Sequence, residues 1–440
     1  MSSHPIFIHS LFRTGSTYLW NKFRQNDKYD CYYEPLNQFL SEISKEKPYI
    51  WGYDSHATDK AGHPRITKNH LAEYEKLLQP NQKGIPFFKK AFSFDDYCNN
   101  SPNPDLKKYI DHLIHAADEE GKRPVLQFNR TAFRIKWFKT YFPGSTNIYL
   151  VRNPRDQWQS YISMFEDNNL DIFLIMDLLA SGLNRNNPWF KGLAPYIYLV
   201  EYHSDKFHDE ELVYRILRDV YSYEELYLIF YYTWLSALWE GACNADILFS
   251  IDLLVEDKFY YKQIIASLKK HDINGIDFPD VQPRHYQEYQ LETGKMVEIE
   301  EMVCAIISRN HRPEERNDFL RKLSPKEKDF FNLKRQSFTK KNIGQLKRKT
   351  KDEVIIKLEN ILKKAFDRYV LIESELKNVR KENDRKNKVI SQKDEQIKEL
   401  NLELIQTKHH LQKVKNSYSY RVGRFVLYPF RMIKKLIKKK

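Results

Sequence analysis

The segment PIFIHSLFRTGSTYLW (residues 5–20) gathers the residue types that bind an anion. The apolar residues Ile6–His9 predict a strand, and a helix is predicted from Tyr18 onward, so a strand-to-helix turn of small residues lies between them. Such a turn directs backbone N–H groups and the positive end of a helix dipole at one anion. The candidate anion-binding residues are Arg13, Thr14, Gly15, Ser16 and Thr17.

The turn differs from the phosphate-binding loop of ATPases, GxxxxGK[ST], at two positions. When the two are aligned on Gly15, Ser10 takes the place of the first glycine and Ser16 the place of the lysine. The length of the loop is kept, but its lysine is lost, and Arg13 becomes the available cation. This loss disfavours a kinase, which relies on that lysine and on Mg²⁺.

A second group of anion-binding residues lies in IYLVRNPRDQWQSYISMF, which includes the predicted strand Asn147–Val151. Arg152 ends this strand, and Ser160 comes eight residues later on the predicted helix. An arginine supplies paired N–H donors and a serine adds a hydroxyl, so the two can hold one phosphate group.

These two motifs resemble those of the sulfotransferase family. FRTGSTYLW is similar to the family's 5′-phosphosulfate loop, usually [KR]-[ST]-G-[ST]-[ST], and VRNPRDQWQS is similar to its 3′-phosphate motif, with Asn153 where aspartate is usual. The resemblance covers about residues 4–280 and is closest to carbohydrate sulfotransferases. The family's further nucleotide segment, which contains an RKG string, is not evident.

The resemblance implies that the donor is PAPS, 3′-phosphoadenosine 5′-phosphosulfate. Arg152 and Ser160 would then hold its 3′-phosphate, and Arg13 would neutralise the charge that develops on the oxygen of the leaving phosphate. A transferring sulfuryl group carries less negative charge than a phosphoryl group. We therefore expect a single cation with backbone donors to suffice, without a metal.

Glu34 in YDCYYEPLNQF is the candidate general base, 21 residues after Arg13. The string YYEPL resembles the Golgi carbohydrate sulfotransferases, in which a glutamate occupies this place; the alternative is a cap of the following helix. His56 is a rival base or a substrate-binding residue, although a lone histidine is often structural. Arg130 ends the strand VLQFNR and would grip the sulfuryl group or the acceptor, unless it forms a surface salt bridge.

Short apolar runs that alternate with amphipathic segments predict an α/β fold for residues 1–330. We expect a P-loop-type three-layer sandwich with a central parallel sheet, and long aromatic-rich helices over 205–245. The predicted strands are Ile6–His9, Pro124–Phe128, Asn147–Val151 and Ile247–Ile251. Asp252, at the end of the last strand, resembles a Walker-B aspartate but is interpreted as part of the late sulfotransferase strand.

The C-terminal quarter has a different pattern. Residues 331–350 predict a basic linker, and a heptad repeat over 351–415 predicts a long coiled-coil helix that forms a homodimer. The alternative is a single charged surface helix. Residues 416–440 predict a basic amphipathic tail that binds an anionic membrane surface. A solubilising tail or a nucleic-acid contact are the alternatives to that membrane anchor.

Charge is distributed unevenly along the chain. The net charge is +13, yet residues 331–440 hold 31 Lys and Arg against 12 Asp and Glu, and residues 1–330 hold 41 against 47. The mildly acidic main domain is therefore not expected to bind nucleic acid. We expect no spanning helix, no secretory signal and four reduced cysteines. A cytoplasmic location is expected, peripheral on the inner face of the cell membrane.

Taken together, the sequence predicts a PAPS-dependent sulfotransferase that acts on a carbohydrate hydroxyl, on a cell-surface polysaccharide or its lipid-linked precursor. Two alternatives stay open: a P-loop kinase-like nucleotide-binding enzyme, and a coiled-coil scaffold that has lost catalysis.

Overall fold

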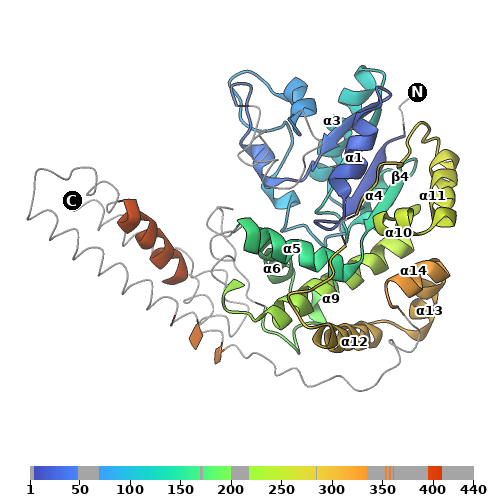
Figure 1. Ribbon diagram of the computed structural model, residues 1–440. Coiled ribbons are helices and arrows are strands. Elements are labelled where there is room, and N and C mark those ends of the chain that lie inside the picture. Colours follow the sequence, from blue (N-terminus) through green and yellow to red (C-terminus); the bar gives the residue numbers. More distant parts are fainter. Residues whose placement is uncertain are drawn as a thin grey trace, which may run out of the picture. The chain divides into compact units, whose positions relative to one another are not determined.

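The computed structural model describes a large part of the chain (Figure 1), namely residues 4–47, 69–168, 172–199, 218–283, 285–333, 352–353, 356–357, 360 and 395–408. The chain divides into two compact units. Unit 1 comprises Met1–Phe173, Asn186–Gly192 and Tyr227–Gly344, and unit 2 comprises Leu174–Arg185, Leu193–Leu226 and Gln345–Lys440. The predicted domain of residues 1–330 thus contains two segments that cluster with the C-terminal part of the chain.

Unit 1 contains a five-stranded sheet in the order β2-β3-β1-β4-β5, and all of its strand pairs are parallel. This confirms the predicted α/β fold with a central parallel sheet. The strands are β1 (Ile6–Ser10), β2 (Tyr29–Tyr33), β3 (Arg123–Phe128), β4 (Thr146–Val151) and β5 (Ile247–Ser250). Four of them agree with the prediction to within a residue or so at each end.

Strand β2 is the one that the sequence did not identify as a strand. It reads YDCYY, with the charged Asp30 inside an aromatic run. Asp30 is buried at the edge of the sheet, where its carboxylate lies 2.7 Å from the ammonium group of Lys76. The ion pair compensates a charge that disfavours a strand assignment from sequence.

Both faces of the sheet are covered, as expected for a three-layer sandwich. On β1, Phe7 joins one buried apolar cluster, whereas Ile6 and Ile8 join a second one. The first cluster includes side chains of α3 (Pro104–Glu119) and α4 (Ile135–Tyr141). The second includes side chains of α1 (Ser16–Arg24) and α11 (Lys258–Lys270). Alternate side chains of a strand point to opposite faces, so the two clusters lie on opposite sides of the sheet.

The remaining helices extend these layers (Figure 1). In unit 1 they are α5 (Pro154–Asn168), α7 (Pro188–Lys191), α10 (Ile251–Glu256), α12 (Thr293–Asn310), α13 (Pro313–Lys322), α14 (Pro325–Phe330) and the 3₁₀ turns η1 (Gln38–Ser41), η2 (Ala72–Leu77) and η3 (Lys90–Phe92). The long α9 (Tyr223–Asn244) is buried over most of its length and supplies the expected aromatic-rich helix. Residues 205–217, the first part of that prediction, lie outside the described residues.

Unit 2 contains most of α6 (Ile172–Leu183) and a helix over residues 395–408. Within this helix four consecutive residues, Leu404, Ile405, Gln406 and Thr407, are buried. A coiled-coil seam would bury only Leu404 and Thr407 of these four.

The linker at 334–350, most of the heptad segment and the whole tail at 416–440 lie outside the described residues. None of the helices that the structure describes is both long and apolar enough to cross a membrane.

Glu240 on α9 is a buried carboxyl group that joins α9 to α4. It accepts a hydrogen bond from the backbone N–H of Lys136 at the start of α4 (3.1 Å) and one from Asn244 Nδ2 (2.8 Å). Burial raises the pKa of Glu240 from 4.5 to about 7. The folded state therefore binds this proton more tightly than the unfolded state does.

We predict that Glu240 makes folding stability fall as the pH rises. The stabilising contribution is complete below pH 4.5 and is lost as the pH rises through about 7. Glu240→Gln should therefore lose less stability over this interval than the parent protein does. Between pH 5 and pH 8, the difference in unfolding free energy between the two proteins should shift in favour of Glu240→Gln by on the order of 1–3 kcal/mol. Chemical denaturation at both pH values measures this, with Glu298→Gln, an exposed residue, as the control. Parallel pH curves for the parent protein and Glu240→Gln would contradict it.

Candidate functional site

A polar residue follows every strand at one edge of the sheet. Because the strands are parallel, their carboxyl ends meet at the same edge, the place where open α/β sheets bind ligands. In the spatial order of the strands these residues are Glu34, Asn129 with Arg130, the loop Leu11–Gly15, Arg152, and Asp252.

The loop between β1 and α1 has a backbone that demands glycine at one position. Gly15 has φ 89°, and a Cβ atom there would lie 2.5 Å from Ile251 Cδ1. Arg13 also adopts a left-handed conformation, with φ 60°. Such conformations cost free energy and occur often at functional sites. The first turn of α1 contains no acidic residue, so no carboxylate there opposes the binding of an anion.

The hydroxyl groups of the loop are engaged within the protein. Thr14 Oγ1 donates to the carbonyl of Leu11 (3.1 Å), and Ser16 Oγ donates to Asn129 Oδ1 (3.1 Å). Thr17 Oγ1 lies 2.9 Å from the hydroxyl oxygen of Tyr33. Each hydroxyl has one proton to donate. An anion bound here would therefore compete for hydrogen bonds that the loop now makes internally.

The structure brings together Arg13, Ser160 and Arg152, which the sequence assigned to two separate motifs. Arg13 Nε donates to Ser160 Oγ (2.9 Å), and Arg152 Nη1 donates to the carbonyl of Arg13 (3.3 Å). Burial and then the charge of Arg152 lower the pKa of the Arg13 guanidinium. The two arginines thus lie next to each other, at the ends of adjacent strands.

Arg152 makes two further contacts. Its carbonyl accepts a hydrogen bond from Trp234 Nε1 on α9 (3.1 Å), and its Nε lies 3.7 Å from Asp252 Oδ1. Asp252 Oδ2 accepts the backbone N–H of Asn153 (2.8 Å). Burial raises the pKa of Asp252 to about 6, against the opposing effect of Arg152. Asp252 therefore positions Arg152 and the start of α5.

Glu34 follows β2. Its carboxylate contacts the side chains of the two residues that follow β3, the amide of Asn129 and the guanidinium of Arg130. Its Oε1 accepts Asn129 Nδ2 (2.6 Å), and its Oε2 forms an ion pair with Arg130 Nη1. Both partners of this ion pair are buried. Glu34 does not cap the following turn η1, because Asn37 does so by accepting the N–H of Phe39 (3.0 Å). The helix-cap alternative for Glu34 is therefore wrong.

Arg130 is a buried residue, which contradicts the surface-salt-bridge alternative. Its guanidinium carbon lies 5.3 Å from the ring centre of Phe12 and 5.1 Å from that of Phe94, and Nη2 donates to Gln38 Oε1 (3.0 Å). Cation–π contacts and hydrogen bonds together fix the guanidinium beside Glu34. The rival base His56 lies outside the described residues, so its role stays a prediction.

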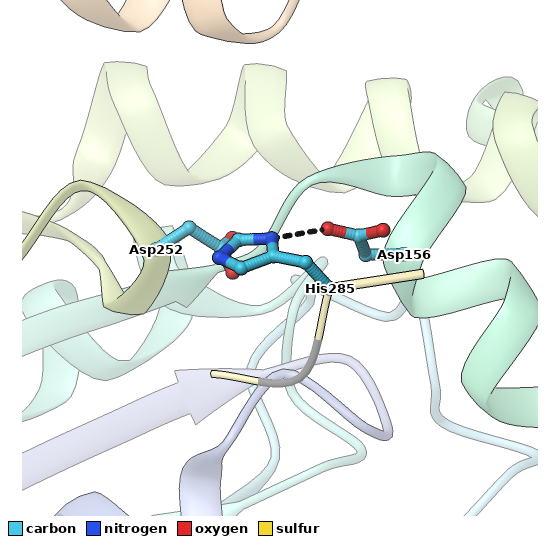
Figure 2. Close-up of side chains that lie close together, drawn as sticks. All are labelled: Asp156, Asp252 and His285. Atoms are coloured by element: carbon cyan, nitrogen blue, oxygen red, sulfur yellow. Dashed lines mark hydrogen bonds and ion pairs between the residues drawn. The ribbon is translucent and has the colours of Figure 1, made fainter. Parts of the chain in front are cut away.

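A segment that no sequence motif marks packs on the start of α5 (Figure 2). Residues 285–290, here called the strap, make three hydrogen bonds to Asp156: from His285 Nδ1 (2.8 Å), from the Tyr286 N–H (3.3 Å) and from the Tyr289 hydroxyl (3.0 Å). The strap lacks periodicity, and its partner is about 130 residues away in sequence, so no local pattern could identify it.

Asp156, Asp252 and His285 lie close enough together to be tested as a metal site (Figure 2). Each offers one ligand atom, and these atoms lie within 4.8 Å of one another. Asp156, however, already accepts the three hydrogen bonds of the strap, and Asp252 is paired with Arg152. These contacts account for the cluster as a structural one. The predicted independence of metal stays a prediction.

Comparison with known proteins adds one positive finding. A family model described as "Sulfotransferase family" matches residues 5–194. No curated protein and no solved structure matches the chain. The matched range contains most of the site described above: the loop with Arg13, Glu34, Arg130, Arg152 and Ser160.

Proposed function

Since residues 5–194 belong to the sulfotransferase family, we propose that this protein transfers a sulfuryl group from PAPS to a hydroxyl group of a carbohydrate. The acceptor would be a cell-surface polysaccharide or its lipid-linked precursor. The observation that carries the proposal is the convergence of Arg13, Ser160 and Arg152 beside the loop before α1. Family membership itself supports sulfuryl transfer in general.

The donor assignment follows from the number and kind of anions that the site can bind. PAPS carries a 5′-phosphosulfate and a 3′-phosphate on one nucleoside. The loop with Arg13 offers a helix N-terminus and a cation for the first group, and Arg152 with Ser160 offers donors for the second. Arg152 contacts the backbone of Arg13, so one small ligand can reach both groups.

The reaction that we propose has a simple balance of atoms. The acceptor oxygen bonds to sulfur while the bond between sulfur and the 5′-phosphate oxygen breaks. The acceptor proton passes to Glu34, and adenosine 3′,5′-bisphosphate leaves. Arg13 stabilises the negative charge that grows on the leaving oxygen.

A kinase-like activity is disfavoured by the side chain that reaches the start of α1. A kinase needs a carboxylate near this position to hold Mg²⁺. The hydroxyl that aligns with the Mg²⁺-binding Ser/Thr of the ATPase loop belongs to Thr17, and it lies 2.9 Å from the hydroxyl oxygen of Tyr33, a neutral group. The loop also lacks the lysine that grips the phosphates of ATP. An inactive scaffold would not need the buried Glu34–Arg130 pair beside this loop, because isolating two charges from water is costly.

We predict that Arg152→Ala weakens binding of adenosine 3′,5′-bisphosphate by about 2–3 kcal/mol, the scale of a charge-assisted contact. Calorimetry on the full chain measures this. The parent protein should prefer the bisphosphate to ATP, with or without Mg²⁺. Lys89→Ala is the control, because Lys89 forms an exposed ion pair with Asp105 (2.6 Å). Mg²⁺-dependent binding of ATP in preference to the bisphosphate would favour the kinase.

We predict that Glu34→Gln lowers turnover of PAPS with carbohydrate acceptors on the order of 10²–10⁴-fold and leaves nucleotide affinity intact, because the proton acceptor is lost while Arg13, Arg152 and Ser160 are kept. Release of adenosine 3′,5′-bisphosphate is followed with a panel of polysaccharides and oligosaccharides. Glu73→Gln serves as the control, because Glu73 also loses an ion pair with an arginine, Arg24 (2.6 Å). Undiminished turnover in Glu34→Gln would assign the base to another residue, of which His56 is the first to test.

We also propose that residues 351–415 form a homodimer and that residues 416–440 bind the inner face of the cell membrane from the cytoplasm. The heptad pattern and the basic amphipathic tail support these proposals. Deletion of residues 351–440 should give a monomer by light scattering, and its sedimentation with phosphatidylserine vesicles should be abolished. A dimer that survives the deletion would place the self-association elsewhere.

A further inference from the structure

Asn129 is a buried amide between the candidate base Glu34 and the loop Leu11–Gly15 with the start of α1, here called the donor loop. It follows β3 directly and is 5% exposed. Its Nδ2 donates to Glu34 Oε1 at 2.6 Å. Its Oδ1 accepts three hydrogen bonds, from Ser10 Oγ (2.7 Å), Ser16 Oγ (3.1 Å) and Gln127 Nε2 (2.9 Å). The amide oxygen is thus bonded to β1, to the start of α1 and to β3.

These contacts fix the orientation of the amide. If the amide were reversed, its NH₂ group would face the Gln127 Nε2 donor, and its oxygen would face the Glu34 carboxylate. The contact between the amide oxygen and the Glu34 carboxylate would be repulsive in a buried site, where unpaired polar groups are costly. An ionised carboxylate only accepts hydrogen bonds, so Glu34 determines that Asn129 presents an N–H donor to it, and the donors of the two serines and the glutamine then meet the amide oxygen.

We propose that Asn129 is a positioning residue that holds the Glu34 carboxylate toward the donor loop. The inference rests on the proposed function. On its other side, Glu34 is paired with Arg130 and lies 3.5 Å from Asn37 Nδ2. Both of these contacts are to Oε2, whereas Asn129 contacts Oε1. Without Asn129 the carboxylate is free to turn both oxygens to Arg130, whose charge would weaken it as a base.

The position also requires a neutral side chain. An aspartate at residue 129 would place a second carboxylate at hydrogen-bond distance from Glu34, where the amide nitrogen now lies 2.6 Å away. Two carboxylates this close share one proton, and the shared proton is lost only at higher pH. A general base must be ionised to act, so Asn129→Asp should restrict activity to higher pH.

Binding of the donor leaves this arrangement in place. When a phosphate group takes the hydrogen bond of Ser16, Asn129 Oδ1 loses one of its three donors. Ser10 and Gln127 continue to orient the amide, at 2.7 and 2.9 Å. Asn129 therefore contacts the base both before and after the donor binds.

The test compares Asn129→Asp and Asn129→Ala with the parent chain over pH 5–9. The reaction followed is the slow hydrolysis of PAPS, with water as the acceptor, so that no carbohydrate needs to be identified first. Asn129→Asp should move the acid limb of the pH–rate profile upward by about 1–2 pH units. Asn129→Ala should lower kcat by roughly 10–100-fold and change KM for PAPS less than threefold.

A second measurement does not depend on turnover. Infrared difference spectra between the full chain and Glu34→Gln, both with adenosine 3′,5′-bisphosphate, identify the carboxylate band of Glu34. The pH midpoint of this band should rise in Asn129→Asp. Asn147→Ala is the matched control, because Asn147 is also a buried amide of the same sheet and hydrogen-bonds His9 (3.1 Å) instead of Glu34.

The outcomes separate this inference from the proposed function. An unmoved infrared band in Asn129→Asp, or equal rate losses in Asn129→Ala and Asn147→Ala, would overturn the positioning role. If the parent chain neither binds nor cleaves PAPS, the proposed function fails. In that case the infrared band without nucleotide still decides whether Asn129 controls Glu34.

Discussion

The site depends on a single topological constraint: five parallel strands end at the same edge of one sheet. Because the order is β2-β3-β1-β4-β5, the residues after β3 and β4 lie on either side of the loop that follows β1. Asn129 and Arg130 therefore approach the loop from one side, and Arg152 approaches it from the other. A sheet with another strand order would separate these side chains even if every local motif were kept.

Charge compensation is the second organising feature of the edge. Two buried carboxylates of the edge are each matched by an arginine: Glu34 by Arg130 and Asp252 by Arg152. Burying unpaired charges would be prohibitively costly, and each pair still needs further hydrogen bonds to be tolerated. Asn129 and the Asn153 N–H supply these bonds. The same neighbours that make the charges tolerable also fix their directions, which is what a catalytic or binding group requires.

The strap shows how a segment with no recognisable motif becomes part of the site. Asp156 holds it through three donors, and Gln159 Oε1 accepts the N–H of Gln290 (2.8 Å). Asp156 and Gln159 lie on α5, the helix that also carries Ser160. The position of α5 is therefore tied both to the loop, where Gln157 Nε2 donates to the carbonyl of Phe12 (2.7 Å), and to the strap.

The sequence by itself determined the α/β class, four of the five strands and the two motifs that are candidates for anion binding, because these depend on local patterns of apolar residues and on short spacings such as that from Arg152 to Ser160. Only the tertiary structure decided that Arg13 meets Ser160, that Glu34 pairs with Arg130 and that Asn129 connects Glu34 to the loop. These contacts join residues up to about 150 positions apart in the chain. They exist because long-range parallel strand pairing, which no short window of sequence encodes, places the strand ends side by side.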